Sequence, residues 1–453
     1  MDVRILSQVL YLRATWRRRD GWDTARIAVH QEQALQRLRA AAYAGSEFYR
    51  RRHAGLHNAP LSELPPVTKG DLMEHFDEAL TTPDVGLADL EGHLRSLIQS
   101  GGDPARPLRG RWRVAATAGT SGRRGVFVWN RAEWASVLAS YARANDWAGV
   151  AAVPGKPVKV ALVSSRMPTH QSAVVGASLA SRFVPTLRLD VTAPTNETVN
   201  ALNAFQPRVL VGYASALRPL AGEQREGRLR IAPRGVMSAS EVLTAQAAAE
   251  MQDAWGSAPF DVYAATETAV IASPCTYRNR HVYEDLIIVE PVDSGGSPVP
   301  PGTTGAKLLV TVLFSRTLPL IRYEMSDTIR LDGHRCPCGR SFSLLEEIEG
   351  RTEDVLRLQG IRGPVTVHPN VFHDVLDEVA TAGWQVVQEP SGLRVLIAGI
   401  KPGYAAGSIR AAVAAALAGA GASPLMVDVQ VVEQLERTAL GKAPFVRALR
   451  TSP

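Results

Sequence analysis

The sequence predicts an α/β fold with a large N-terminal domain and a small α+β C-terminal domain. From about residue 110 onward, apolar runs alternate with stretches of helical spacing, which is typical of a mainly parallel sheet covered by helices. After the cysteine-containing stretch CPCGR, the segment GRTEDVLRLQG begins a shorter pattern of strands and helices. A chain of 453 residues is too long for one ordinary domain. We therefore expect a large domain over residues 1–350 and a small domain over residues 351–453.

The individual elements are predicted in chain order. Residues 30–55 have the spacing of a helix that ends in SEFYRRR, and Thr68 to Asp71 in LPPVTKGDL have the pattern of a helix start. Apolar runs predict strands of the parallel sheet at residues 157–165, 182–191, 207–215 and 260–265. Helical spacing predicts the covering helices at residues 132–144, 196–205 and 244–255.

Composition and the terminal segments indicate the compartment of the protein and the classes of partner it is expected to lack. The net charge of +6 comes from 50 basic and 44 acidic residues that are interspersed, which favours a solvated basic surface over a nucleic-acid-binding surface. The N-terminus lacks the uninterrupted apolar core of a secretory signal, and the alanine-rich run 411–422 is too short to span a bilayer. We expect a soluble, cytoplasmic protein with no nucleic-acid partner and no membrane partner.

The segment ATAGTSGRRG, residues 116–125, combines glycines, hydroxyl side chains and two arginines. Glycine allows several N–H groups to point at one group of oxygens, and hydroxyls add donors, so such a loop suits a phosphate. The segment lacks the Gly-Lys-Ser/Thr ending of the best-known phosphate loop. From its pattern alone, a surface turn is an equally good interpretation.

Three later motifs are individually weak. YAATET, residues 263–268, places an aromatic ring, a hydroxyl and a carboxylate together after a strand. RYEMSDT places Asp327 at a strand end, where an aspartate is usually a turn former. RTALGKAPF presents Lys442 beside a glycine, and only six of the 50 basic residues are lysines. Ammonium and guanidinium groups do different chemistry, so Lys442 is a catalytic candidate, although an exposed lysine is usually only solvated.

Together, and in this order, these motifs resemble the adenylate-forming enzymes, a superfamily of acyl-CoA synthetases, luciferases and peptide-synthetase adenylation domains. SEFYRRR, LPPVTKGDL, PLIRYEMSDT and CPCGR are similar to the phenylacetate-CoA ligase branch, and the resemblance spans nearly the whole chain. It implies adenylation of a small organic acid, in the first place an aromatic one, with ATP and Mg²⁺ and with release of pyrophosphate. Transfer of the activated group to a thiol, that of coenzyme A or of a carrier protein, would follow.

The resemblance also implies a nucleotide site. The ATP phosphates would lie against the glycine and hydroxyl loop, with Arg123 or Arg124 as supporting charge. The loop residues implied are Thr117, Gly119, Thr120, Ser121 and Gly122. Thr266 would touch the α-phosphate, and Glu267 would hold Mg²⁺.

The base and the ribose would be held by other segments. Ser238, Ala239 and Ser240 would line the adenine edge, and Tyr263 would stack on the adenine ring. Asp327 would accept both ribose hydroxyls, a task that suits a carboxylate because it has several lone pairs and no competing donor. Arg351 would reach the ribose or a phosphate.

Lys442 resembles the mobile lysine of the family, which bridges the substrate carboxylate and the phosphate oxygens. Both reactants are negative, so fixed positive charge and alignment must supply most of the catalysis. The small domain would be mobile and would swing about a hinge at Glu353 or Asp354 to admit the second nucleophile. The alternative is that these two acids only cap a domain junction.

His170 falls where the family often places a histidine or an aromatic residue near the acyl carboxylate. A hydrogen-bonded structural histidine is equally consistent with the sequence. Further substrate contacts would come from this neighbourhood and from around Tyr213 and Ala264.

The cysteines form a separate pattern. Cys336 and Cys338 are separated by one proline, too close for an unstrained disulfide. With Cys275 and His281 they supply three sulfurs and one imidazole, which matches a closed, structural Zn²⁺ site. His334 is an alternative fourth ligand, and unrelated buried thiols are the alternative to a metal site.

Two departures from the family leave the acceptor of the activated group open. TSGRRG has arginines where family members often carry lysine, and RLQGIRGPVTVHP has extra residues in the segment along which pantetheine would pass. Transfer to a nitrogen nucleophile, which would form an amide or another N-linked bond, is one alternative. A nucleotide-binding module without catalysis is another, but the complete set of Glu267, Asp327 and Lys442 favours an enzyme.

Overall fold

The computed structural model describes most of the chain. It describes residues 3–117, 124–150, 157–351, 355–361, 363–367, 369–377, 379, 381, 383–400, 404–438 and 443–449, with the backbone alone at 349–351, 370, 373 and 374. Within these ranges, no helix has both the length and the apolar character needed to cross a membrane.

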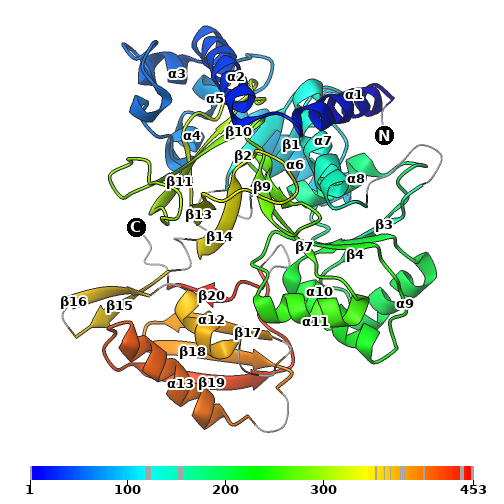
Figure 1. Cartoon of the computed structure of the whole chain (residues 1–453), viewed down its shortest axis with the longest axis vertical. Coiled ribbons are helices and arrows are strands. Elements are labelled where there is room, and N and C mark those ends of the chain that lie inside the picture. Colours follow the sequence, from blue (N-terminus) through cyan, green and yellow to red (C-terminus); the bar gives the residue numbers. More distant parts are fainter. Residues whose placement is uncertain are drawn as a thin grey trace.

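A nine-stranded sheet forms the centre of the large domain, in the order β13-β14-β9-β8-β7-β6-β5-β3-β4 (Figure 1). Its parallel half consists of β3 (Val160–Ser164), β4 (Thr186–Asp190), β5 (Val209–Gly212), β6 (Gly235–Ala239) and β7 (Phe260–Ala265). Its antiparallel half consists of β8 (Ala269–Pro274), β9 (Arg280–Val282), β13 (Asp327–Asp332) and β14 (Leu344–Arg351). The predicted α/β class with a parallel sheet is confirmed, and four of these strands were predicted within a few residues.

Helices cover both faces of the parallel half. Packed on one face are α9 (Thr195–Phe205), α10 (Ala214–Arg225) and α11 (Ala245–Trp255), which share a core with Ala161 and Leu210 of the sheet. On the other face lies α8 (Gln171–Leu179), which contacts β3 and β4. Beside it, α7 (Arg131–Trp147) packs against β8, and α1 (Val3–Arg19) packs against α7. Strand residues alternate between faces, so the two helix layers meet different side chains of the same strands.

Further helices precede the sheet along the chain. They are α2 (Thr24–Gly45), α3 (Glu47–Arg52), η1 (Leu61–Glu63), α4 (Lys69–Glu74), α5 (Phe76–Ala79) and α6 (Leu87–Ser100). The single helix predicted over residues 30–55 is wrong in its continuity: Ser46 ends α2, and its hydroxyl caps α3 by accepting from Tyr49 N. The predicted helix start is confirmed, because Thr68 and Asp71 form a reciprocal capping box at α4.

Two antiparallel sheets complete the large domain. They contain β1 (Arg113–Ala116) with β2 (Val126–Trp129), and β10 (Ile287–Val292), β11 (Lys307–Val312) and β12 (Tyr323–Met325). The hairpin of β1 and β2 carries the predicted phosphate loop between its strands.

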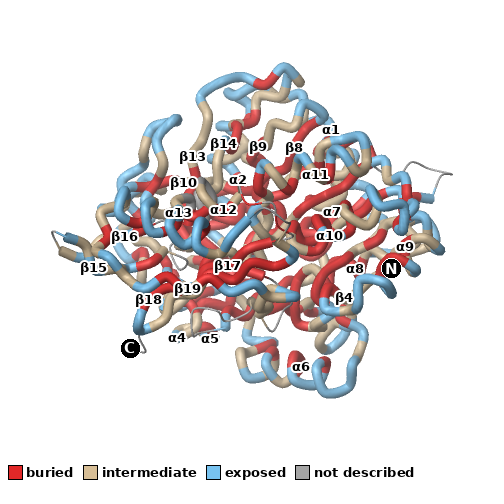
Figure 2. The backbone as a smooth tube through the Cα atoms, turned by 90° about the horizontal axis from the view of Figure 1, so that it is seen from below, coloured by how far each residue is buried: buried red, intermediate tan, exposed pale blue. Residues whose placement is uncertain are grey.

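The C-terminal segment has a core of its own, built from residues 356–446. Its strands are β15 (Leu356–Gly360), β16 (Gly363–Val367), β17 (Gly383–Glu389), β18 (Gly392–Ala398), β19 (Met426–Val432) and β20 (Val446–Arg447), and its helices are α12 (Asn370–Leu376) and α13 (Ala406–Gly419). β17 to β20 form one sheet, which lies apart from the nine-stranded sheet in Figure 1. Figure 2 shows buried residues along its strands and exposed residues on the surrounding loops.

Candidate active site

A cavity of about 760 Å³ lies where the parallel strands end. Ser164, Gly212, Ala239 and Ala265, the last residues of β3, β5, β6 and β7, all line it. β4 and β5 lie on opposite sides of β3, so the chain reverses its direction of travel across the sheet at this point. Open α/β sheets bind ligands at such a switch point, outside the carboxyl ends of the strands.

Thr266, Glu267 and Asp327 are among the candidate residues that line this cavity. Thr266 and Glu267 follow β7 in the turn toward β8, and Asp327 begins β13 with 7% of its surface exposed. The hydroxyl of Tyr263 donates to Asp327 Oδ2 over 2.9 Å. Tyr263 itself is buried and is not among the lining residues; the stacking of its ring on adenine stays a prediction. Its phenol orients the carboxylate of Asp327.

Ser238, Ala239 and Ser240 were expected to line the adenine edge, but their side chains do not all point to the same face of the sheet. Ala239 and Ser240 line the cavity, and Ser240 adopts a left-handed backbone conformation with φ of 71°. Ser238 is fully buried and does not line the cavity, because neighbouring strand residues point to opposite faces. The expectation for Ser238 is therefore corrected. Backbone strain at Ser240 is of the kind found at ligand sites.

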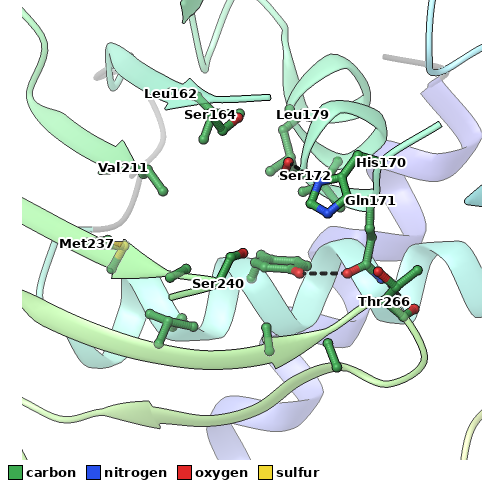
Figure 3. A pocket seen from close by; sticks show the side chains of 18 of the residues that line it. Leu162, Ser164, His170, Gln171, Ser172, Leu179, Val211, Met237, Ser240 and Thr266 are labelled. Atoms are coloured by element: carbon green, nitrogen blue, oxygen red, sulfur yellow. Dashed lines mark hydrogen bonds between the residues drawn. The ribbon is translucent and has the colours of Figure 1, made fainter. Parts of the chain in front are cut away.

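His170 lies on the helix side of the cavity, at the N-cap of α8. Its Nδ1 is 2.8 Å from the hydroxyl of Ser172. The next residue, Gln171, was not predicted from the sequence: its amide donates to the carbonyl of Thr266 over 3.1 Å and accepts from the hydroxyl of Tyr141 over 3.1 Å. Figure 3 shows His170 and Gln171 on the same side of the open space. Gln171 thus ties α7 and α8 to the turn that carries Glu267.

Two residues named as substrate neighbours, Tyr213 and Ala264, also line the cavity. The hydroxyl of Tyr213 accepts from the backbone N–H of Ser165 over 3.2 Å. Burial raises the pKa of Tyr213, so its phenol stays neutral near neutral pH.

Glu241 links the large domain to the C-terminal segment, and it too was missed from the sequence. One carboxylate oxygen accepts from Ser215 N over 2.9 Å, at the start of α10, and the other accepts from Ala443 N over 3.1 Å. Arg437 reaches the hydroxyl of Ser215 over 3.4 Å. Lys442 lies outside the described residues, but its chain neighbour Ala443 is held beside the switch point.

The phosphate loop is described only at its ends. The hydroxyl of Thr117 accepts from Gly125 N over 2.9 Å, and Thr117 N donates to Gly125 O over 2.9 Å. Thr117, directly after β1, lines the cavity. The other candidates in the loop, Gly119, Thr120, Ser121, Gly122 and Arg123, lie outside the described residues.

The hinge candidates Glu353 and Asp354 also lie outside the described residues. The backbone of Arg351 pairs with Asp327 across β13 and β14. This pairing places the end of the large domain directly beside the carboxylate expected to hold the ribose.

A second cluster gathers Cys275, His281, Cys336 and Cys338, with one ligand atom from each lying within 4.8 Å of the others. Cys275 Sγ is 3.6 Å from Cys336 Sγ, and Cys338 Sγ is 3.2 Å from His281 Nε2. A tetrahedral zinc with bonds of about 2.3 Å to sulfur spaces two sulfurs about 3.8 Å apart, whereas a disulfide needs about 2.05 Å. The spacing therefore fits a metal and not a disulfide.

The surroundings of this cluster orient its ligands. His281 Nδ1 lies 3.2 Å from the carbonyl of Phe342, which leaves Nε2 directed at the sulfurs. The amide of Asn279 donates to Cys336 Sγ over 3.2 Å. His334, the alternative ligand, has 91% of its side chain exposed and contacts Asp332, so it is not part of the cluster.

Comparison with known proteins finds similar sequences and similar structures among ligases. No protein-family model matches it. Phenylacetate-coenzyme A ligase of Thermus thermophilus is 26% identical over 370 residues, which cover 76% of this chain and 74% of the relative. The enzyme of the same name from Escherichia coli is 26% identical over 391 residues, 79% of this chain and 78% of the relative. The crystal structure of 2-hydroxyisobutyryl-CoA ligase in the postadenylation state with 2-HIB-AMP matches with a TM-score of 0.74 at 20% identity, covering 96% of this chain and 92% of that one.

Proposed function

We propose that this chain, a homologue of the phenylacetate-coenzyme A ligases with the fold of the adenylate-forming enzymes, is an acid-thiol ligase. It uses ATP to activate a carboxylic acid as an acyl adenylate and then transfers the acyl group to the thiol of coenzyme A. The names of the two relatives and the adenylate bound by the structural neighbour support this reaction.

The observation that carries the proposal is the meeting of Thr266, Glu267, Asp327 and His170 around one cavity at the switch point of the sheet. They come from three segments of the chain, and His170 and Asp327 are 157 positions apart. Asp327, oriented by Tyr263, would hold the ribose hydroxyls. Glu267 would bind Mg²⁺, a hard cation that prefers carboxylate oxygens and would neutralise phosphate charge.

In the first half-reaction, a carboxylate oxygen of the acid forms a bond to the α-phosphorus of ATP. The bond from that phosphorus to the bridging oxygen breaks, and pyrophosphate leaves with the electron pair. Negative charge accumulates between the acid and the phosphates, so a nearby cation lowers the barrier. Lys442 would supply this cation, because Glu241 holds the neighbouring Ala443 close to the site.

In the second half-reaction, the thiolate sulfur of coenzyme A attacks the carbonyl carbon of the adenylate, and AMP leaves. The boundary near residue 350, where the backbone of Arg351 ends β14, would let the C-terminal domain turn between the two steps. This movement would withdraw Lys442 and open a path for the thiol.

Pyrophosphate release from ATP with a panel of carboxylic acids tests the first step. Replacing Lys442 with alanine should lower kcat by about a hundredfold to a thousandfold, the usual effect of losing one preorganised donor. Replacing Lys159, which is exposed and contacts the carbonyl of Phe205, serves as the matched control. Unchanged pyrophosphate release by Lys442→Ala would refute the catalytic role of this lysine. The absence of pyrophosphate release with every acid would refute the proposed adenylation activity.

Mass spectrometry of the products identifies the acceptor. With coenzyme A present, we expect the acyl thioester and AMP to replace the acyl adenylate. An adenylate that persists with coenzyme A but is consumed by an added amine would instead assign transfer to nitrogen.

We also propose that Cys275, His281, Cys336 and Cys338 bind a structural zinc ion. Three sulfurs and one imidazole complete a tetrahedral shell, so no open coordination position is left for catalysis. The ion would join β8 and β9 to the segment before β14 and so stabilise the edge strands behind Asp327. Elemental analysis of the purified protein should find one zinc per chain, and a zinc-free preparation of equal thermal stability would overturn this role.

A further inference from the structure

The cavity does not stop at the nucleotide-binding end of the strands. It continues along one face of the parallel sheet, and Val160, Leu162 and Ser164 of β3 line it at every second position. Val209 and Val211 of β5 do the same. With a rise of about 3.3 Å per residue, the four steps from residue 164 to residue 160 extend the passage by about 13 Å.

The walls of this deep part are apolar. Met237 and Val262 continue the sheet wall, Val175 and Leu179 of α8 also line the cavity, and Leu6, Val9 and Leu10 of α1 contribute further apolar side chains. Figure 3 shows Leu162, Leu179, Val211 and Met237 around the same open space.

The opposite face of the same strands is covered by closely packed helices. Ala161, Val163 and Leu210 are fully packed against α9, α10 and α11. Leu162 and Val211, in contrast, are only partly buried although they lie in the middle of the sheet. Apolar side chains that face an unfilled interior space are the usual lining of a site for an apolar ligand.

The polar groups along the deep part already have partners within the protein. Arg13 forms two hydrogen bonds with Asp146, at 2.7 and 2.6 Å. The amide of Asn145 donates to the carbonyl of Tyr141, and the hydroxyl of Thr186 donates to the carbonyl of Val184. A ligand in this region therefore contacts apolar side chains, and it does not need to supply hydrogen-bond partners to the side chains of Arg13, Asn145 and Thr186.

We infer that the acid activated by this protein carries an elongated apolar chain that extends from the switch point toward α1. This inference rests on the proposed function, because it names the class of acid that the same site accepts. The carboxylate would lie near His170, and the chain would run between β3, β5 and α8. The far end lies beside Leu10 and Phe183, which are 52% and 42% exposed, so the longest chains would reach the solvent there.

A series of unbranched acids from propionate to dodecanoate, with phenylacetate as the reference, tests this class. Each added methylene that becomes buried should raise kcat/KM for pyrophosphate release by about threefold to fourfold, and decanoate should exceed phenylacetate by at least tenfold. A preference for phenylacetate with decanoate inactive overturns the inference and leaves the proposed function intact. No release with any acid refutes the proposed function itself.

Val160 provides a paired test of where the chain lies. Val160→Trp should lower kcat/KM for decanoate at least tenfold more than for phenylacetate, because the indole would fill the deep part. Val160→Ala enlarges the same position and should keep the preference for decanoate. Equal losses for both acids in a Val160→Trp protein of unchanged melting temperature overturn the inference. If Val160→Trp does not fold, the chain-length series measured with the natural protein decides whether the site prefers elongated acids.

Discussion

Tyr263 donates its phenolic hydrogen to Asp327 over 2.9 Å, across the interior between β7 and β13. The two residues are 64 positions apart in the sequence, and one of them faces the cavity while the other lies buried behind it. This bond fixes the direction in which the carboxylate presents its remaining lone pairs. In the proposed reaction those lone pairs hold the ribose.

Tyr263→Phe removes this bond and should raise the KM for ATP. A hydrogen bond to a charged group contributes about 1.5–3 kcal/mol, so we expect an increase of about tenfold or more with a smaller change in kcat. Steady-state pyrophosphate release at varied ATP concentration measures it. Tyr277→Phe, at a tyrosine that is 58% exposed, should leave the KM unchanged. An unaltered KM in Tyr263→Phe would show that the phenol does not position Asp327.

Glu241→Ala should slow adenylation by about tenfold or more, because it removes the acceptor that holds Ala443 next to Lys442. Glu241→Gln keeps one acceptor oxygen and should lose less. The second half-reaction, started from supplied acyl adenylate and coenzyme A, should be almost unaffected if the domain turns away between the steps. Rapid-quench measurement of both half-reactions separates the effects, and equal slowing of both steps would argue against a contact specific to adenylation.

Cys338→Ser and His281→Gln should each lower the zinc content to less than half of that in the natural protein and reduce the melting temperature. Both remove a ligand from a site that has no spare donor among the described residues. His334→Gln is the matched control, because His334 is exposed and lies outside the cluster. Full zinc content in His281→Gln would exclude this histidine as a ligand.

His53 should make the protein less stable as the pH falls. Burial, with a smaller contribution from Arg39 and Arg52, lowers the pKa of His53 to about 4. An unfolded chain binds the proton near pH 6.5, so stability that is complete above that value is lost as the pH falls toward 4. His53→Leu should show a smaller drop in melting temperature between pH 7 and pH 4.5 than the natural protein. His57→Leu, at an exposed position, removes only the smallest of the contributions that lower the pKa of His53 and should nearly follow the natural protein. Identical drops in both variants would contradict the assignment.

The sequence predicted the parallel part of the fold well because buried parallel strands have a strong local signal. Residues 157–165 and 207–215 each contain a run of apolar residues, and these runs became β3 and β5. The break at Ser46 was missed because residues on both sides of it have helical spacing, and the break depends on a cap that one hydroxyl makes. The resemblance to adenylate-forming enzymes, drawn from the order of the motifs, is confirmed by the relatives and by the fold.

The parts of the site that the sequence could not predict are those that depend on tertiary contacts. Gln171 and Glu241 stand in no motif used above, and their roles come from bonds to Thr266 and Ala443 across the fold. The bond from Tyr263 to Asp327 was not predicted either, because a motif does not say which distant carboxylate its first residue contacts. The deep passage also was not predictable, since every second residue of a buried strand is apolar whether it meets a helix or a space.

The width of that passage depends on one glycine of α8. A methyl group on Gly176 would lie 2.7 Å from a terminal carbon of Leu162, so helix and strand touch there without room for a larger residue. Leu162 is itself a lining residue, and it would have to yield into the lumen. Alanine in place of Gly176 would therefore narrow the passage and limit the length of the acid that fits. A paralogue that differs only at this position would accept short acids and exclude their longer analogues.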